Sequence, residues 1–139
     1  MSEDYKDKVA VVTGGASGIG FAPMAYQSLY SATKSALIGL TGSLRYELWD
    51  ESIRLSTVIP GTVAPPIWNK AGGAPESAKT PDESARAILK GLAANERIVI
   101  VTDADRDGSV NAFRPDAAKG VDDYLLSVAR QRKSGKMVV

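Results

Sequence analysis

Short apolar runs rich in β-branched residues recur along the chain, and each is followed by glycine, proline or polar residues. Strands that helices cover on both faces are continuously apolar, so these runs predict buried strands of a parallel sheet. The predicted strands span residues 8–13, 53–59 and 97–102.

A stripe of leucines predicts a helix over residues 31–50. The leucines recur every three or four residues, which places them on one face of a helix. They are Leu37, Leu40, Leu44 and Leu48. The preceding residues 21–29 contain Pro23 and show no helical periodicity, so we expect a loop there.

Two further helices are indicated in the second half of the chain. The first is predicted over residues 81–94, because Thr80, Pro81 and Glu83 match a capping box with proline at the first helical position. The second is predicted over residues 117–132 from an apolar face made of Val121, Tyr124, Leu125, Val128 and Ala129. Residues 62–80 and 103–116 are polar or rich in proline and glycine, and are expected to form loops.

The order of these elements predicts an α/β fold, because strands that alternate with helices build a parallel sheet. With 139 residues, the chain is long enough for one domain and short for two. We therefore expect a single domain spanning residues 1–139.

Composition narrows the chemistry that such a domain can perform. The chain carries 17 Lys+Arg and 16 Asp+Glu, and this balance gives no broad attraction to nucleic acid or to an anionic membrane. It contains no Cys and no His, which excludes thiolate nucleophiles, Ser-His-Asp catalysis and Cys- or His-ligated metals. The charged first residues do not resemble a signal peptide, and no apolar run reaches the roughly 18 residues of a membrane span. A cytoplasmic protein is expected.

A glycine-rich turn directly follows the first predicted strand. Gly14, Gly18 and Gly20 are spaced so that the backbone can turn tightly and approach a pyrophosphate closely. A helix that begins after such a turn offers free N–H groups to phosphate. A glycine-rich turn without any ligand is the alternative interpretation of the same residues.

Tyr30 and Lys34 lie four residues apart, so they share one face of the leucine-striped helix. An ammonium group beside a phenol favours the phenolate, and such a tyrosine can exchange a proton with a substrate oxygen. In a chain without His, this pair is a candidate acid–base centre. The alternative is an ordinary polar pair on a solvated helix face.

The segments KVAVVTGGASGIG, YSATK and VIPGTVAPPI, in this order, resemble the signatures of the short-chain dehydrogenase/reductase family. The resemblance extends from about residue 8 to residue 102. It implies a partial Rossmann-type, doubly wound parallel sheet with about three of the family's strands. It also implies hydride transfer between NAD or NADP and an alcohol or carbonyl substrate. NAD is slightly favoured, because the glycine-rich turn contains no Arg or Lys.

The resemblance implies roles for individual residues. Tyr30 corresponds to the catalytic acid/base, Lys34 to the lysine that makes the phenol more acidic and holds the nicotinamide ribose, and Ser17 to the catalytic serine. The pyrophosphate-binding loop corresponds to Gly14, Gly18, Ile19 and Gly20. The turn that borders the nicotinamide corresponds to Pro60, Gly61 and Val63.

The spacing between the motifs departs from the family. Four strands and their connections normally separate them, and each βαβ unit takes roughly 30 residues. Here Gly20 and Tyr30 are only ten residues apart, which implies that about a hundred residues are absent. Ser17 fits both the end of the glycine motif and the family's serine position, thirteen residues before Tyr30. We therefore expect the junction of an internal deletion within residues 17–20.

Two functions follow from this reasoning. The first is an oxidoreductase of the short-chain dehydrogenase/reductase type, whose cofactor binding is weakened because the part that contacts the adenosine is missing. The second is a catalytically impaired remnant that acts as an interaction module. In the family the helix corresponding to residues 31–50 often packs against a neighbouring subunit. The resemblance therefore implies that a second copy of the chain could be the partner, in a homo-oligomer formed through this helix.

A metal site is not expected. Asp103, Asp105 and Asp107 begin like a calcium-binding loop, but such a loop needs a bidentate Glu at its twelfth position. That position is occupied by Arg114, whose positive charge would repel the ion. A polar surface loop is the preferred interpretation of these residues.

Overall fold

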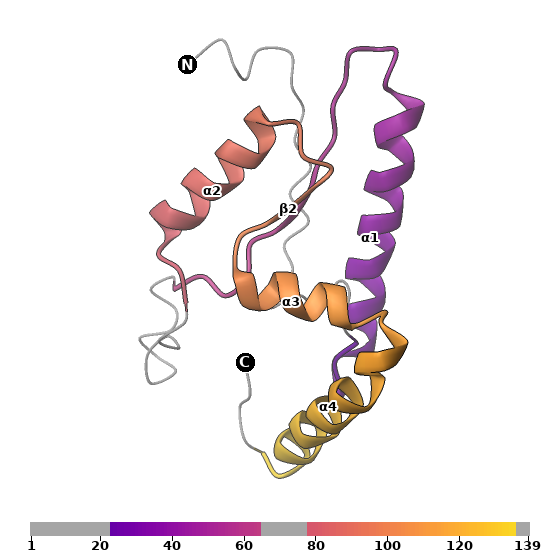
Figure 1. The fold of residues 1–139 in the computed structure, drawn as a ribbon, viewed down its shortest axis with the longest axis vertical. Coiled ribbons are helices and arrows are strands. Elements are labelled where there is room, and N and C mark those ends of the chain that lie inside the picture. The colour runs from indigo at the N-terminus through magenta and orange to yellow at the C-terminus, as the bar shows by residue number, and fades with distance from the viewer. Residues whose placement is uncertain (1–22, 65–77, 136–139) are drawn as a thin grey trace.

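The computed structural model describes residues 23–64 and 78–135, and the elements in this part follow the expected α/β order (Figure 1). The strand predicted over residues 8–13 lies outside the described residues. The described elements are, in order, α1 (Ser28–Glu47), β1 (Thr57–Ile59), α2 (Pro81–Ala93), β2 (Ile98–Ile100), α3 (Asp103–Asn111), the 3-10 helix η3 (Pro115–Ala117) and α4 (Ala118–Lys133).

β1 and β2 form a parallel pair, and α2 is the crossover between them. Val58 lies opposite Val99, and the backbone ladder extends beyond the strands, since the Val101 N–H donates to the Ile59 carbonyl at 3.0 Å. All three β1 residues are buried, as expected for a strand that is covered on both faces. The predicted strands 53–59 and 97–102 are therefore present, each with three regularly paired residues.

The capping box at the start of α2 is confirmed. The Thr80 hydroxyl accepts from the Glu83 N–H at 3.2 Å, and the Glu83 carboxylate accepts from the Thr80 N–H at 2.9 Å. Two hydrogen bonds from Thr80 lower the pKa of the Glu83 carboxyl. The bond from the Thr80 N–H has the larger effect, and the bond from the Thr80 hydroxyl has the smaller one. Gly91 faces the sheet, where a Cβ would lie 2.6 Å from a methyl group of Val99. α2 can therefore pack directly on β2.

α1 confirms the predicted helix but not the role of its leucine stripe. The helix begins at Ser28, earlier than expected, so residues 28–29 belong to it while residues 23–27 are irregular. Its buried residues are Ser31, Thr41 and Arg45, whereas Leu40 is 55% exposed. The apolar face is thus only partly covered by the described residues.

Arg45 ties α1 to two other segments. Its guanidinium donates to the Leu55 carbonyl and, at 2.8 Å each, to the backbone and side-chain oxygens of Asn95. Leu55 precedes β1, and Asn95 lies in the turn between α2 and β2. The side chain is only 5% exposed, so this hydrogen-bond network forms part of the interior.

The prediction of a loop over residues 103–116 is wrong, because residues 103–111 form α3. Thr102 caps this helix, its hydroxyl accepting from the Asp105 N–H at 3.1 Å. Acidic residues in the first turn suit the positive end of the helix dipole, and the helix accommodates Gly108. The polar composition therefore concealed a helix whose start is specified by capping.

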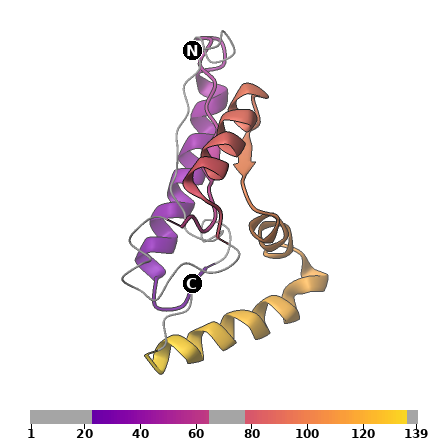
Figure 2. The same ribbon diagram turned by 90° about the vertical axis from the view of Figure 1, so that its left-hand side faces the viewer.

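α4 lies at the end of the molecule where α1 begins (Figures 1 and 2). Val128, only 2% exposed, packs on Met24, and Arg132 donates to the Ala25 carbonyl at 3.1 Å. The predicted helix is confirmed, but Tyr124 of its expected apolar face is 59% exposed. Among the described residues, we find no helix with the length and hydropathy needed to cross a bilayer.

Candidate functional site

Tyr30 and Lys34 meet on the first two turns of α1. The Lys34 Nζ lies 5.2 Å from the centroid of the Tyr30 ring, within the range of a cation–π contact. Tyr30 is 41% exposed, so its phenol is accessible to a small molecule. The helix therefore brings together the two side chains that the sequence proposes for proton transfer.

The second part of the site is the turn that follows β1. Pro60 ends the strand, because it cannot donate to the ladder, and Gly61 adopts a φ of 68° that favours glycine. Val63 forms a parallel bridge with Lys79, and the Ala64 N–H donates to the Lys79 carbonyl at 2.9 Å. This pairing fixes the far end of the turn.

The near end of the turn packs against the start of α3. A Cβ built on Gly61 would lie 2.5 Å from the Asp105 Oδ2 and 2.7 Å from the Thr102 Cγ2. Sequence reasoning missed this contact, because it placed Asp105 in a surface loop. The pattern Thr102-x-x-Asp105 could have indicated the start of a helix there, since it resembles a capping box with Asp in place of Glu.

Both parts lie at the end of the molecule toward which β1 and β2 run. α1 runs in the opposite direction, so Tyr30, near its start, is at the same end as the Gly61 turn (Figure 1). In open parallel sheets, ligands bind beyond the carboxyl ends of the strands. The remaining proposed site residues lie outside the described part of the chain; they are Gly14, Ser17, Gly18, Ile19 and Gly20.

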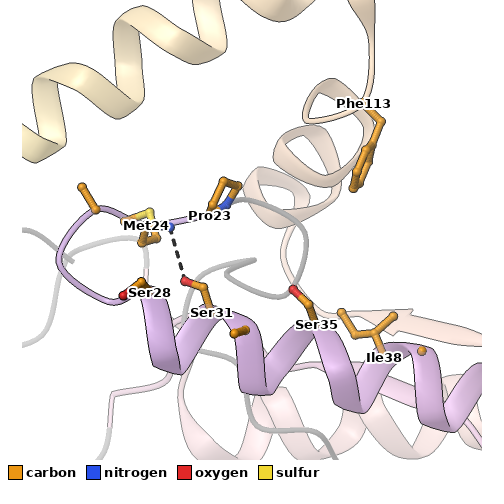
Figure 3. A pocket seen from close by; sticks show the side chains of 10 residues that line it. Pro23, Met24, Ser28, Ser31, Ser35, Ile38 and Phe113 are labelled. Atoms are coloured by element: carbon orange, nitrogen blue, oxygen red, sulfur yellow. Dashed lines mark hydrogen bonds between the residues drawn. The ribbon is translucent and has the colours of Figure 1, made fainter.

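A largely apolar pocket of about 860 Å³ opens along a neighbouring face of α1. Ser28, Ser31 and Ser35 line it from the helix, and Phe113 lies across from them (Figure 3). The Ser31 hydroxyl accepts from the Met24 N–H at 3.3 Å, which holds the segment before α1 against the helix. Tyr30 is next to this pocket in sequence but does not line it.

The described residues contain no group of three acidic side chains close enough to hold a metal ion. Asp103, Asp105 and Asp107 lie on α3, and the Asp105 carboxylate accepts from the Thr102 hydroxyl. These aspartates therefore begin a helix and do not form the surface loop that we expected.

The parallel strands, the crossover helix and the site beyond the strand ends define a Rossmann-type α/β protein. The model of the short chain dehydrogenase family matches residues 19–74, which include Tyr30, Lys34 and the Gly61 turn. The match covers less than half of the chain, and this segment is similar to short-chain dehydrogenases. A comparison with curated proteins finds no match.

Two solved structures are similar to this chain. One, described as a short-chain dehydrogenase from Novosphingobium aromaticivorans, is 22% identical with a TM-score of 0.60; the match covers 93% of this chain and 49% of that one. The other is a short-chain dehydrogenase from Sphingobium yanoikuyae in complex with NADPH. It is 29% identical with a TM-score of 0.56, and the match covers 89% of this chain and 47% of that one. The chain thus spans about half the length of these two proteins.

Proposed function

We propose that this chain is an oxidoreductase that transfers a hydride between a nicotinamide cofactor and an alcohol or carbonyl group of a small molecule. The observation that carries the proposal is the Lys34 Nζ, 5.2 Å from the Tyr30 ring, at the end where the strands terminate. The similarity of residues 19–74 to the short-chain dehydrogenase family supports the reaction class. The NADPH bound to the Sphingobium yanoikuyae protein supports a nicotinamide cofactor, NAD or NADP.

The described residues fit such a cofactor. Lys34 would hold the nicotinamide ribose, because its ammonium can donate hydrogen bonds to the ribose hydroxyls. The turn at the end of β1 would border the nicotinamide through Pro60, Gly61 and Val63. The pyrophosphate is assigned by resemblance to Gly14, Gly18, Ile19 and Gly20. When bound, the cofactor supplies the ring carbon that accepts or gives up the hydride.

Tyr30 moves the proton. During oxidation its phenolate oxygen accepts the proton of the substrate hydroxyl, and during reduction the phenol returns a proton to the carbonyl oxygen. Ser17 is the third proposed catalytic residue, by its resemblance to the family's serine.

We also infer that residues 1–139 form one truncated dinucleotide-binding domain with an internal deletion joined within residues 17–20. Gly20 and Tyr30 are ten residues apart, where the family pattern needs four strands. The match to the family model begins at residue 19, inside the inferred junction. The missing segment would contain the residue that contacts the adenosine ribose, so we expect the cofactor to bind weakly.

Cofactor-linked turnover tests the proposed function. Protein whose intact mass agrees with 14.7 kDa is assayed with a panel of secondary alcohols and with NAD or NADP at high concentration. We expect slow reduction of one of the two cofactors that depends on the alcohol. If neither cofactor is reduced at any concentration, the oxidoreductase proposal is wrong, and the chain acts without catalysing this reaction.

A further inference from the structure

Asp105 is a buried carboxylate outside the three segments that resemble the short-chain dehydrogenase/reductase family. It is 8% exposed and takes part in none of the ion pairs formed within the described ranges 23–64 and 78–135. Removing a carboxylate from water is costly unless hydrogen bonds compensate. Here the Thr102 hydroxyl donates to it, and the Asp105 N–H donates back to the same hydroxyl oxygen.

This reciprocal pair is held rigidly at the end of the sheet. The Val101 N–H donates to the Ile59 carbonyl at 3.0 Å, which fixes the end of β2 beside the end of β1. The Ser109 hydroxyl donates to the Asp105 carbonyl at 2.6 Å, one turn further along α3. The position of the Asp105 carboxylate is therefore set by the sheet and by α3 together.

The backbone of Gly61 packs against this carboxylate. A Cβ at Gly61 would approach the Asp105 Oδ2 to 2.5 Å, so a larger residue fits there only if the Asp105 and Thr102 side chains or the turn itself shift. The opposite end of the same turn is tied to Lys79. The turn is thus clamped between Lys79 on one side and the Thr102–Asp105 pair on the other.

We propose that Asp105, held by Thr102, is a positioning residue that sets the place of the Gly61 turn. The part of this inference that concerns the cofactor rests on the proposed function, which assigns this turn to the nicotinamide. Displacement of the carboxylate would allow the turn to move toward α3, away from the position that Lys34 and Tyr30 require. Asp105 would then act on binding through Gly61 and without touching the cofactor.

Amide hydrogen exchange tests the positioning role in the protein without any cofactor. The reporters are the N–H groups of Ala64 and Lys79, which donate across the base of the turn at 2.9 and 3.0 Å. In Asp105→Ala we expect these two amides to exchange about tenfold faster, while the Ala94 N–H at the end of α2 stays unchanged. Asp103→Ala is the matched control, because it removes an exposed acid from the same first turn of α3.

Asp105→Asn keeps the shape and an oxygen that accepts from Thr102, so it should restore slow exchange. It also provides a testable variant if Asp105→Ala does not fold. Unchanged exchange at Ala64 and Lys79, or an equal acceleration at Ala94, would overturn the proposal and leave Asp105 as a helix cap alone.

Titration with NAD and NADP then separates the two proposals. If the wild-type protein binds one of them, we expect several-fold weaker binding in Asp105→Ala and unchanged binding in Asp103→Ala. Equal binding by the Asp105→Ala and wild-type proteins would overturn the link to the cofactor. If the wild-type protein binds neither, the proposed function fails, while the exchange measurement still decides the role of Asp105.

Discussion

Ser84 carries a hydroxyl group that is buried and has no hydrogen-bond partner within the described ranges 23–64 and 78–135. Ser84 is 4% exposed and lies on the buried face of α2. A buried hydroxyl without a partner loses its bonds to water and gains nothing in return. We therefore expect this hydroxyl to lower the stability of the fold.

Ser84→Ala should raise the free energy of unfolding by about 1 kcal/mol, because it removes the unpaired hydroxyl. Urea denaturation of both proteins measures the difference. Ser43→Ala on the exposed side of α1 is the control, because it tests the higher helix propensity of alanine alone. A loss of stability in Ser84→Ala would show that the hydroxyl does have a partner.

Single residues also mark the limit of what the sequence predicts. The contact between Tyr30 and Lys34 follows from their spacing, because residues four apart on a helix are neighbours. The contact between Asp105 and Gly61 does not follow from any spacing, since 44 positions separate the two residues and only the sheet brings them together. Similarly, nothing in the leucine stripe indicated that Arg45 would be buried.

At the scale of elements, α2 was the most predictable part of the fold and α3 the least. The start of α2 is specified by the familiar capping box of Thr80, Pro81 and Glu83, and its end by Asn95 with a φ of 55°. α3 has a cap as well, but its polar sequence lacks the apolar periodicity by which helices are usually found. Local capping, and not an apolar face, therefore defines this helix.

Two glycines within helices should respond in opposite ways to substitution by alanine. Gly91→Ala should lower the free energy of unfolding by about 1–3 kcal/mol, because the new Cβ would lie 2.6 Å from Val99. Gly42→Ala is the matched control, since no atom outside the local helix backbone lies within 4 Å of its Cβ position. It should stabilise α1 by about 0.5–1 kcal/mol. Thermal or urea unfolding measures the change in the free energy of unfolding in each variant. Equal changes in the two variants would contradict the packing of α2 on β2.

The capping box predicts a dependence of stability on pH. Hydrogen bonds from Thr80 lower the pKa of the Glu83 carboxyl in the folded state, below the value of 4.5 expected without them. A depressed folded-state pKa adds stability above the unfolded value, and this stability is lost as the pH falls through the folded value. The unfolding free energy should therefore decrease below about pH 4.5, and the decrease should be smaller in Glu83→Gln. Glu51→Gln, in the turn after α1, removes a carboxyl group outside the capping box and is the matched control.

At the scale of the whole molecule, the described residues leave apolar surface uncovered. Leu29 is 84% exposed and Leu40 is 55% exposed, and their separation of eleven residues places them on one face of α1. Exposed apolar surface on a helix favours association with a partner. From the resemblance to the family, we expect that a second copy of the chain would cover this face.

Sedimentation of the purified protein tests this inference. We expect a dimer that Leu40→Glu converts to monomer, because the introduced carboxylate would be buried at the interface. Leu89→Glu, at a residue of α2 that is 47% exposed, is the control and should leave the dimer intact. A wild-type protein that sediments as a monomer at all concentrations would contradict the inferred interface.

If Tyr30 carries the proton during cofactor-linked oxidation, as we propose, two tyrosines of the same helix should differ in their effect on the rate. Tyr30→Phe removes the proposed proton carrier, whereas Tyr46→Phe removes the hydroxyl of a tyrosine that is 65% exposed near the other end of α1. The measurement is the rate of cofactor reduction by a secondary alcohol at high cofactor concentration. We predict that Tyr46→Phe keeps the wild-type rate of cofactor reduction. In Tyr30→Phe this rate should fall at least about a hundredfold, which is the usual contribution of a general acid–base group. A wild-type rate in Tyr30→Phe would contradict the role of Tyr30 as the proton carrier.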